Sequence, residues 1–144
     1  MKVTKEVTFD SAHMLSNYQG KCANLHGHTY KLQVSIEAPL QSKGNEECMV
    51  MDFNTLKKAI DSVTEAFDHA IIFSDIGYRS EAESALMDWA DKYGMAYVII
   101  SAGKSTSEYI ATEIKSRISC YLAEVPVPDI TVSVWETPTS FVEA

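Results

Sequence analysis

The sequence has little cysteine, no long apolar run and fewer basic than acidic side chains. Its 3 cysteines, among 144 residues, form no paired pattern, which argues against a disulfide scaffold and is typical of the reducing cytoplasm. No apolar stretch approaches the roughly 20 residues that a membrane-spanning helix needs. The first residues, MKVTKEVTF, lack the apolar core of a secretory signal. We therefore expect a cytoplasmic protein with no membrane-embedded part.

The shortage of basic side chains bears on possible partners. The 12 Lys and Arg against 20 Asp and Glu give a net charge of −8, whereas binding to a phosphate backbone requires a basic face. We therefore expect no nucleic-acid partner. An anionic small substrate would need a locally basic pocket, for which the nearest candidates in sequence are Lys21, Arg79 and Lys104.

The composition is that of one globular domain, which we expect to span residues 1–144 without repeats or linkers. The chain is 46% apolar and 22% charged, and its length suffices for one core. Apolar and polar residues alternate over Thr29–Glu37 and over the opening residues to Phe9, which predicts two half-buried strands. Further strands are predicted at Cys48–Met51, Met95–Ile100 and Ile130–Thr137.

Two segments in the middle of the chain repeat apolar residues every three to four positions, which predicts amphipathic helices. The first begins after Asp52 as N-cap and ends near Asp68. The second spans about 80–93 and stops at Gly94. The apolar face of this second helix would consist of Ala82, Leu86, Trp89 and Tyr93.

A third helix would carry the apolar row from Ile110 to Leu122 and end at the proline-containing segment 125–128. Strands therefore come first, helices occupy the middle, and a strand finishes the chain. We expect an α+β fold, with a small antiparallel sheet and helices packed on one face.

Histidine is also scarce, and three of the 4 histidines stand where one metal ion could collect them. His26 and His28 share the parity of the apolar row of their strand, so both side chains should point to its buried face at one end. His13 follows the first strand on the parity of Phe9, and a hairpin of the two strands would bring its ring to the other two. Three histidines and an open position are typical of a catalytic zinc site; the alternative is three surface or hydrogen-bonded histidines.

Cys22, four residues before His26, is the first candidate for chemistry beside such a site. A thiol next to a bound dication and imidazoles loses its proton more readily, which makes it a usable base or nucleophile. It could equally be a fourth ligand that closes the site into a structural one. The sequence leaves both interpretations open.

Two carboxylates are further candidates. Asp68 precedes His69 at the end of the first helix, where it could orient the imidazole for acid–base work; an ordinary helix terminus is the alternative. Glu136 shares the parity of the apolar row of the last strand, so its carboxylate needs a partner. That partner would be an Arg or Lys, or a ligand with two adjacent N–H donors, such as the edge of a pterin or guanine. Alternatively, the strand frays at Pro138 and leaves Glu136 in water.

Glu108 has a structural explanation from its surroundings. The run Ser105-Thr106-Ser107-Glu108 precedes a periodic apolar segment, and Ser-x-x-Glu in that position is the pattern of a capping box. We therefore predict that Ser105 caps the third helix and that Glu108 reaches back to it.

Six strings occur in order along almost the whole chain: FDSAH, CANLHGHTY, MVMDF, FDH, STSE and WETPTS. Together they resemble the 6-pyruvoyltetrahydropterin synthase superfamily, and most of all its branch of bacterial 6-carboxytetrahydropterin synthases of queuosine biosynthesis. The three residues between Cys22 and His26 favour that branch. The stretch from Asp75 to Gly103 is longer than in the shorter bacterial members and has no implied role.

The resemblance implies roles for the candidate residues. In that family three histidines hold a catalytic Zn2+, a cysteine abstracts a proton, an Asp–His pair relays a proton, and a glutamate anchors the pterin ring. The matching residues are His13, His26 and His28 for the zinc, Cys22 for the base, Asp68 and His69 for the relay, and Glu136 for the anchor, with Ser107 and Glu108 near the pterin edge.

The resemblance also implies a reaction and an assembly. The reaction converts 7,8-dihydroneopterin triphosphate to 6-carboxytetrahydropterin, acetaldehyde and triphosphate. The alternatives are a synthase that eliminates only triphosphate, to a pyruvoyl product, and a non-catalytic pterin-binding protein with a structural zinc. The implied fold is the T-fold, assembled as a homo-oligomeric barrel, a trimer or hexamer, with sites between subunits. Glu136 and Cys22 could then serve one site from different chains.

Overall fold

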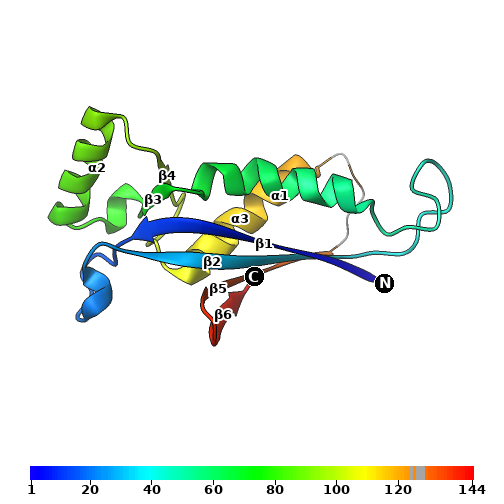
Figure 1. The fold of residues 1–144 in the computed structure, drawn as a ribbon, viewed down its shortest axis with the longest axis horizontal. Coiled ribbons are helices and arrows are strands. Elements are labelled where there is room, and N and C mark those ends of the chain that lie inside the picture. The colour runs from blue at the N-terminus through cyan, green and yellow to red at the C-terminus, as the bar shows by residue number, and fades with distance from the viewer. Residues whose placement is uncertain (124, 126–128) are drawn as a thin grey trace.

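A long antiparallel hairpin forms the centre of the fold (Figure 1). Its strands, β1 (Lys2–His13) and β2 (His26–Glu37), pair over their full lengths, from Lys2 opposite Glu37 to His13 opposite His26. The computed structural model describes residues 1–123, 125 and 129–144. The predicted hairpin is confirmed, and its closed end carries the histidines.

Four more strands extend this hairpin into a six-stranded sheet of order β4-β3-β1-β2-β5-β6. On one side, β5 (Asp129–Thr137) pairs antiparallel with β2, and β6 (Ser140–Glu143) pairs antiparallel with β5. On the other side, β3 (Ala70–Phe73) and β4 (Tyr97–Ile99) join through parallel pairings. The antiparallel sheet that we expected is therefore confirmed for four strands, and two parallel strands make the whole sheet mixed.

Two helices, α1 (Phe53–Phe67) and α3 (Ser107–Tyr121), cover one face of the sheet. Apolar side chains of β2, α1 and α3 meet there in one core, with no exposed surface at Tyr30, Leu32, Val34, Ile36, Leu56, Ile60, Ile110 and Ile114. The alternation of β2 and the periodicity of the helices both direct apolar residues into this layer. The α+β class with helices on one face is confirmed. Among the described residues, no helix has the length and apolar character needed to cross a membrane.

The predicted helix boundaries agree with the capping groups. The carboxylate of Asp52 accepts a hydrogen bond from the Asn54 N–H at 2.7 Å and caps α1. Ser80 caps α2 (Glu81–Tyr93), and this helix ends at Gly94, whose φ of 66° is the left-handed conformation that glycine adopts readily. The segment proposed to end α3 lies, at 126–128, outside the described residues; α3 itself ends at Tyr121.

The strand predicted at Cys48–Met51 is wrong. The Gln41 N–H donates to the Met49 carbonyl and the Cys48 N–H to the Gln41 carbonyl, which closes a loop in which Cys48 has a φ of 65°. Val50 and Met51 are 7% and 3% exposed. Only the second half of the run is therefore buried, and none of it pairs as a strand.

Strands β3 and β6 are absent from the prediction because each has only four residues, too few for a period to be recognised. Two short 3-10 turns, η1 (Lys21–Ala23) and η2 (Ile76–Tyr78), are likewise unpredicted. Strand β4 is confirmed, with bounds inside the predicted range.

The predicted apolar face of α2 is also wrong. Trp89 and Tyr93 are 47% and 56% exposed, and Ala82 is exposed as well, whereas Glu83 and Ala90 are fully buried. Figure 1 shows α2 at the end of the molecule where the β1–β2 hairpin closes, away from the layer of α1 and α3. The helix thus turns a carboxylate, and not its aromatic side chains, toward the rest of the protein.

Candidate metal centre and active site

Three histidine rings converge at the closed end of the β1–β2 hairpin. His13 lies directly opposite His26 in the strand register, and His28 lies two residues further along the same face of β2. The ring centroids are 4.6 Å apart for His13 and His26, 5.2 Å for His13 and His28, and 4.8 Å for His26 and His28. One nitrogen of each ring and one oxygen of Glu136 all lie within 4.8 Å of one another, a group that could hold a metal ion.

The hydrogen bonds of these rings determine which nitrogen faces the centre of the group. Nδ1 of His13 lies 2.6 Å from the Ser105 carbonyl and Nδ1 of His26 lies 2.8 Å from the Asn24 carbonyl. A carbonyl oxygen can only accept, so both Nδ1 atoms carry a proton. The Nε2 atoms of all three histidines are buried without a hydrogen-bond partner among the described residues. Buried orphan nitrogens that converge on one point fit a metal site.

Two of the three rings are largely withdrawn from solvent. His13 is 1% exposed. Burial lowers the pKa of His28, and the neighbouring imidazoles lower it further against the opposing effect of Glu136. A neutral imidazole is the form that binds a metal, so His28 is in the required state at neutral pH.

Glu136, near the end of β5, supplies the negative charge of the group. Its Oε1 lies 3.1 Å from Nε2 of His13 and of His28, and its Oε2 accepts a hydrogen bond from the Ser107 hydroxyl at 2.8 Å. The contact with His13, followed by the hydrogen bond from Ser107, lowers the pKa of Glu136 to about 2. The contacts with the rings do not have hydrogen-bond geometry at the Nε2 atoms. An ionised carboxylate beside inward-facing imidazoles needs a positive charge among them, either a proton or a metal ion.

Of the three environments expected for Glu136, the part of the chain that the structure describes excludes two, an Arg or Lys partner and fraying into water, and leaves the ligand with two N–H donors. Strand β5 continues to Thr137, so the strand does not fray before Glu136. Within the described residues its carboxylate contacts histidines and Ser107, and forms no ion pair with a lysine or arginine.

A cavity of about 410 Å3 opens beside the histidines. Its wall includes His13, Tyr18, Cys22, Ser107, Glu108 and Glu136. Cys22 lies in η1 and outside the four-residue group that could hold a metal ion. The cavity therefore unites three of the predicted groups, the thiol of Cys22, the carboxylate of Glu136 and the imidazole of His13, within one chain. Glu136 and Cys22 do not need different subunits to meet.

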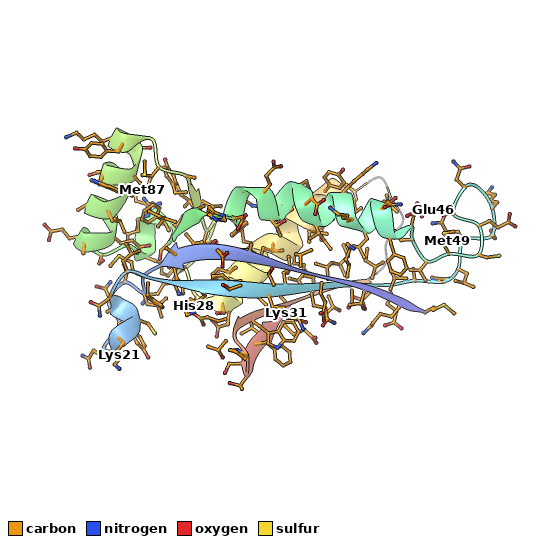
Figure 2. The ribbon with its side chains drawn as sticks, viewed as in Figure 1. Lys21, His28, Lys31, Glu46, Met49 and Met87 are labelled. Atoms are coloured by element: carbon orange, nitrogen blue, oxygen red, sulfur yellow. The ribbon has the colours of Figure 1, made fainter. Side chains whose placement is uncertain are left out.

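Two of the three basic candidates, Lys104 and Arg79, bond to backbone carbonyls elsewhere. The Lys104 ammonium donates to the Ser16 carbonyl at 3.0 Å, and Nε of Arg79 donates to the Ser74 carbonyl at 2.6 Å. Lys21 adjoins Cys22 in η1 and is exposed; Figure 2 shows it near the end of the sheet that carries His28. No lysine or arginine belongs to the wall of the cavity as formed by the described residues.

The predicted capping box is wrong. The N-cap of α3 is Thr106, and it forms no side-chain capping hydrogen bond. The Ser105 hydroxyl instead donates to the Met14 carbonyl at 2.9 Å, which turns this side chain toward the loop after β1. Glu108 is therefore free of a capping role and faces the cavity from the first turn of α3.

The Asp68-His69 pair lies at a different place. His69 follows the C-cap Asp68, has a φ of 57° and is 79% exposed in its side chain. Its Nδ1 lies 3.0 Å from Asp68 Oδ2, and Asp68 Oδ1 accepts from the Asp10 N–H at 2.9 Å. The Asp10 N–H, followed by His69, lowers the pKa of Asp68.

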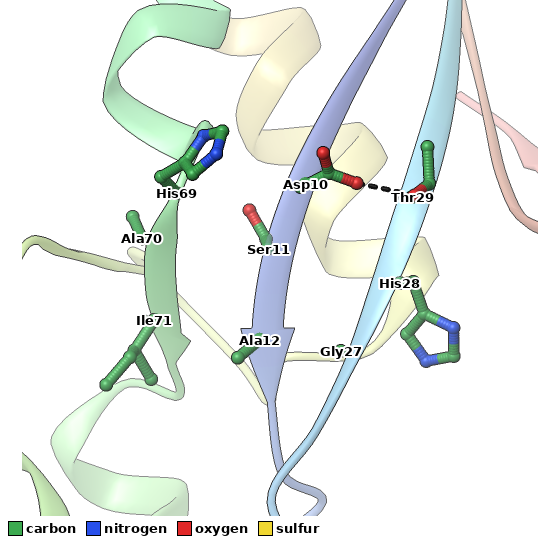
Figure 3. Close-up of a pocket in the computed structure, with 9 residues that line it drawn as sticks. All are labelled: Asp10, Ser11, Ala12, Gly27, His28, Thr29, His69, Ala70 and Ile71. Carbon is green, nitrogen blue, oxygen red and sulfur yellow. Dashed lines mark hydrogen bonds between the residues drawn. The ribbon is translucent and has the colours of Figure 1, made fainter.

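Figure 3 shows this second cleft, which His69 and His28 line from opposite sides of β1. The structure thus pairs Asp68 with His69 as predicted, but does not bring the pair to Cys22 within one chain.

Two contributors to the site were not predicted. The Ser105 carbonyl orients His13, and a backbone group carries no signal in the sequence. The Tyr30 hydroxyl is buried without a partner among the described residues, with its ring 5.4 Å from that of His28 and 6.1 Å from that of His13. The parity of Tyr30 with His28 was the only signal, and it also fits an ordinary core residue.

The family model for 6-pyruvoyl tetrahydropterin synthase matches residues 2–144. The chain belongs to this family. A 6-carboxy-5,6,7,8-tetrahydropterin synthase of Haemophilus influenzae is 37% identical, covering 99% of this chain and 96% of the relative. A putative 6-carboxy-5,6,7,8-tetrahydropterin synthase of Pyrococcus abyssi is 39% identical, covering 97% of this chain and 85% of the relative.

Solved structures agree with the family in fold. The 6-pyruvoyl tetrahydropterin synthase of Plasmodium falciparum superposes with a TM-score of 0.73 at 20% identity, covering 100% of this chain and 96% of that one. An uncharacterized protein of Wolinella succinogenes superposes with a TM-score of 0.77 at 22% identity, covering 100% of this chain and 97% of that one. The expected T-fold is therefore confirmed.

Proposed function

We propose that this protein is a zinc-dependent 6-carboxytetrahydropterin synthase. It would convert 7,8-dihydroneopterin triphosphate and one water molecule to 6-carboxytetrahydropterin, acetaldehyde and triphosphate, a step of queuosine biosynthesis. One observation carries the proposal: three histidines direct orphan Nε2 atoms to one point, beside a cavity that holds both a thiol and an ionised carboxylate. The names of the two relatives support the carboxy-forming reaction.

The proposed metal ligands are the Nε2 atoms of His13, His26 and His28. Three imidazoles leave an open position, as in catalytic zinc sites. When bound, zinc acts as a Lewis acid that withdraws electron density from oxygen atoms of the substrate side chain. The Nδ1 hydrogen bonds of His13 and His26 hold both rings in the tautomer that such binding requires.

Cys22 is proposed as the base and not as a fourth ligand. Its place on the cavity wall, outside the group around the metal position, supports this choice. The Leu15 N–H donates to the Cys22 carbonyl at 2.8 Å and holds η1 against the end of β1. The thiolate would take a proton from a carbon of the substrate side chain.

Glu136 is proposed to anchor the pterin ring. An ionised carboxylate can accept two parallel hydrogen bonds from the amino-pyrimidinone edge, which fixes the ring relative to the thiol. Ser107 holds one carboxylate oxygen, and Glu108 lies on the same wall. With metal bound, the contacts of Glu136 with His13 and His28 would give way to contacts with the substrate.

The Asp68-His69 pair is proposed to serve the site of a neighbouring subunit in a homo-oligomer. Within one chain it opens onto a separate cleft and its imidazole is largely exposed, so an interface would have to bring it to a thiol. Asp68 would then orient His69, which returns a proton to the substrate.

The direct test is to incubate the zinc-loaded protein with 7,8-dihydroneopterin triphosphate and to measure acetaldehyde and pterin products. We expect acetaldehyde in equal amount to 6-carboxytetrahydropterin. Triphosphate release with a pyruvoyl product and no acetaldehyde would instead identify a 6-pyruvoyltetrahydropterin synthase. Tight pterin binding without any product would identify a binding protein.

A further inference from the structure

The segment between Asp75 and Gly103 contributes no group to the proposed reaction, yet its helix α2 buries a carboxylate. We propose that this carboxylate, Glu83, is a positioning residue that holds His13 and Cys22 in place at the metal centre. The inference rests on the proposed metal site and extends it to a helix that carries none of the proposed ligands or catalytic groups.

Glu83 is buried more completely than is usual for a charged side chain. Its exposed fraction is 0%, and it forms no ion pair with the described lysines, arginines or histidines. Its Oε1 accepts from the Ser74 N–H at 2.7 Å, and its Oε2 accepts from the Ser16 hydroxyl. Burying a carboxylate costs free energy, and these two hydrogen bonds offset that cost and hold Glu83 in the interior. Glu83 thereby joins α2 to the residue after β3 and to the loop after β1.

One path of hydrogen bonds leads from Glu83 to His13. The Ser74 hydroxyl accepts from the Ser105 N–H at 3.1 Å, and the Ser105 carbonyl accepts from Nδ1 of His13 at 2.6 Å. Ser74 and Ser105 are both 0% exposed, so no solvent replaces a lost partner. Glu83 holds Ser74, Ser74 holds the backbone of Ser105, and that backbone orients the ring of His13.

A second path leads from Glu83 to Cys22. Ser16, which is 1% exposed, accepts from the Ser80 N–H at 2.7 Å and donates to Glu83. The adjacent Leu15 N–H donates to the Cys22 carbonyl at 2.8 Å. Ser16 therefore fastens the loop after β1 to the start of α2, and the neighbouring Leu15 fastens the same loop to Cys22 in η1. Figure 2 shows that η1, β2 at His28 and α2 at Met87 occupy the same end of the molecule.

A simpler role for Glu83 is to attach α2 to the domain. In that case its loss would lower stability without changing the metal site of the molecules that remain folded. The two roles differ in zinc affinity measured below the melting temperature, and in the local exposure of Cys22 in the metal-free protein.

The experiment measures the zinc dissociation constant of full-length variants by competition with a chelator. Loss of a direct outer partner of a metal ligand typically weakens binding about 10–100-fold. Glu83 acts on His13 through Ser74 and Ser105, so we expect the lower end of this range, about 10-fold, for Glu83→Ala and a smaller loss for Glu83→Gln. Ser74→Ala breaks the same path one step later, so its effect and that of Glu83→Gln should not add. Glu81→Ala, an exposed neighbour in α2, should leave the affinity unchanged.

Two further measurements separate positioning from stability. Leu56→Ala, on the buried face of α1, should lower the melting temperature without weakening zinc binding. In the metal-free protein, Glu83→Gln should raise the rate of Cys22 alkylation severalfold, as followed by peptide mapping. Cys48 and Cys120 are already exposed and serve as references whose rates should not change.

The outcomes distinguish this inference from the proposed function. If the wild-type protein does not bind zinc, the proposed metal site is wrong. If the wild type binds zinc, and Glu83→Gln and Ser74→Ala bind it within twofold of the wild type with unchanged Cys22 alkylation, the positioning role is wrong and Glu83 is a structural anchor. Both of these variants conserve volume closely, so the test does not depend on Glu83→Ala being able to fold.

Discussion

His13 and His26 face each other across the last register pair of the β1–β2 hairpin, with ring centroids 4.6 Å apart. Because directly opposed residues of an antiparallel pair project from the same face, the hairpin itself brings the two imidazoles together. His28 joins them from the same face of β2. The proposed metal position thus lies on two paired strands, with Glu136 of β5 beside it, and rigid strands favour a preorganised site.

The first prediction concerns the ligands. His28→Ala should weaken zinc binding at least 100-fold, because two imidazoles would remain of three. Measurement by chelator competition, with metal content checked by mass spectrometry, tests this. His69→Ala is the matched control and should retain one zinc per chain. Unchanged zinc content in His28→Ala would contradict the three-histidine site.

The second prediction separates base from ligand. Cys22→Ala should keep zinc and lose turnover by about 10²–10⁴-fold, which is the usual contribution of a positioned base. Zinc content and acetaldehyde formation are measured on the same preparation. A variant that folds but has lost its metal would show that Cys22 is a ligand instead.

The third prediction uses the backbone conformation of His69, whose φ of 57° favours glycine over other residues. The free energy of unfolding of His69→Gly should exceed that of His69→Ala by about 1 kcal/mol, because alanine is strained at this φ. Both variants should lose most of their turnover. Denaturant unfolding and the acetaldehyde assay together separate the conformational contribution from the chemical one, and full activity in His69→Gly would exclude the imidazole from the reaction.

The fourth prediction tests whether one site draws on two chains. Cys22→Ala and His69→Ala subunits should each be inactive, but unfolding and reassembling them together should restore part of the activity. Some sites of the mixed oligomer would then combine an intact thiol with an intact imidazole from the other chain. Mixtures in which every site stays inactive would mean that Cys22 and His69 act within one chain.

The fifth prediction concerns the metal-free protein in acid. The pKa of Glu136 is lowered from 4.5 to about 2 in the folded state, so its stabilising contribution is complete above pH 4.5 and is lost as the pH falls through about 2. Glu136→Gln should therefore be less stable than the wild type at pH 6, and the difference should narrow between pH 4.5 and 2. Melting temperatures across this range measure it; a difference independent of pH would show that Glu136 is not ionised by its contacts.

Local sequence patterns predicted correctly those features that depend only on residues close together in the sequence. The alternation from His26 to Ile36 predicted both the strand and the face on which its histidines lie, because strand parity is a property of the backbone. The cap at Asp52 was predicted for the same reason, since its side chain bonds to an N–H group two residues away. The cap at Ser80 was not predicted, although its bond to the Glu83 N–H is equally local.

Other features depended on distant segments. The Ser105–Glu108 pattern predicted a capping box. The Ser105 hydroxyl instead donates a hydrogen bond to the Met14 carbonyl, and the helix begins at Ser107. The apolar residues of α2 predicted a buried face that includes Trp89, whereas the fold buries Glu83 because Ser16 and Ser74 lie there to bind it. Periodicity identifies the faces of a helix, but the partner elements decide which face is buried.

The sequence by itself therefore determined the α+β class, the hairpin and the side of β2 that carries two histidines, since these follow from residue spacing along one chain segment. Only the tertiary structure decided that Glu136 completes the group, that Cys22 lies on the cavity wall and outside the group, and that Glu83 is tied to the site. These relationships join residues far apart in the sequence, and the spatial distances between them depend on how strands and helices pack and not on sequence separation.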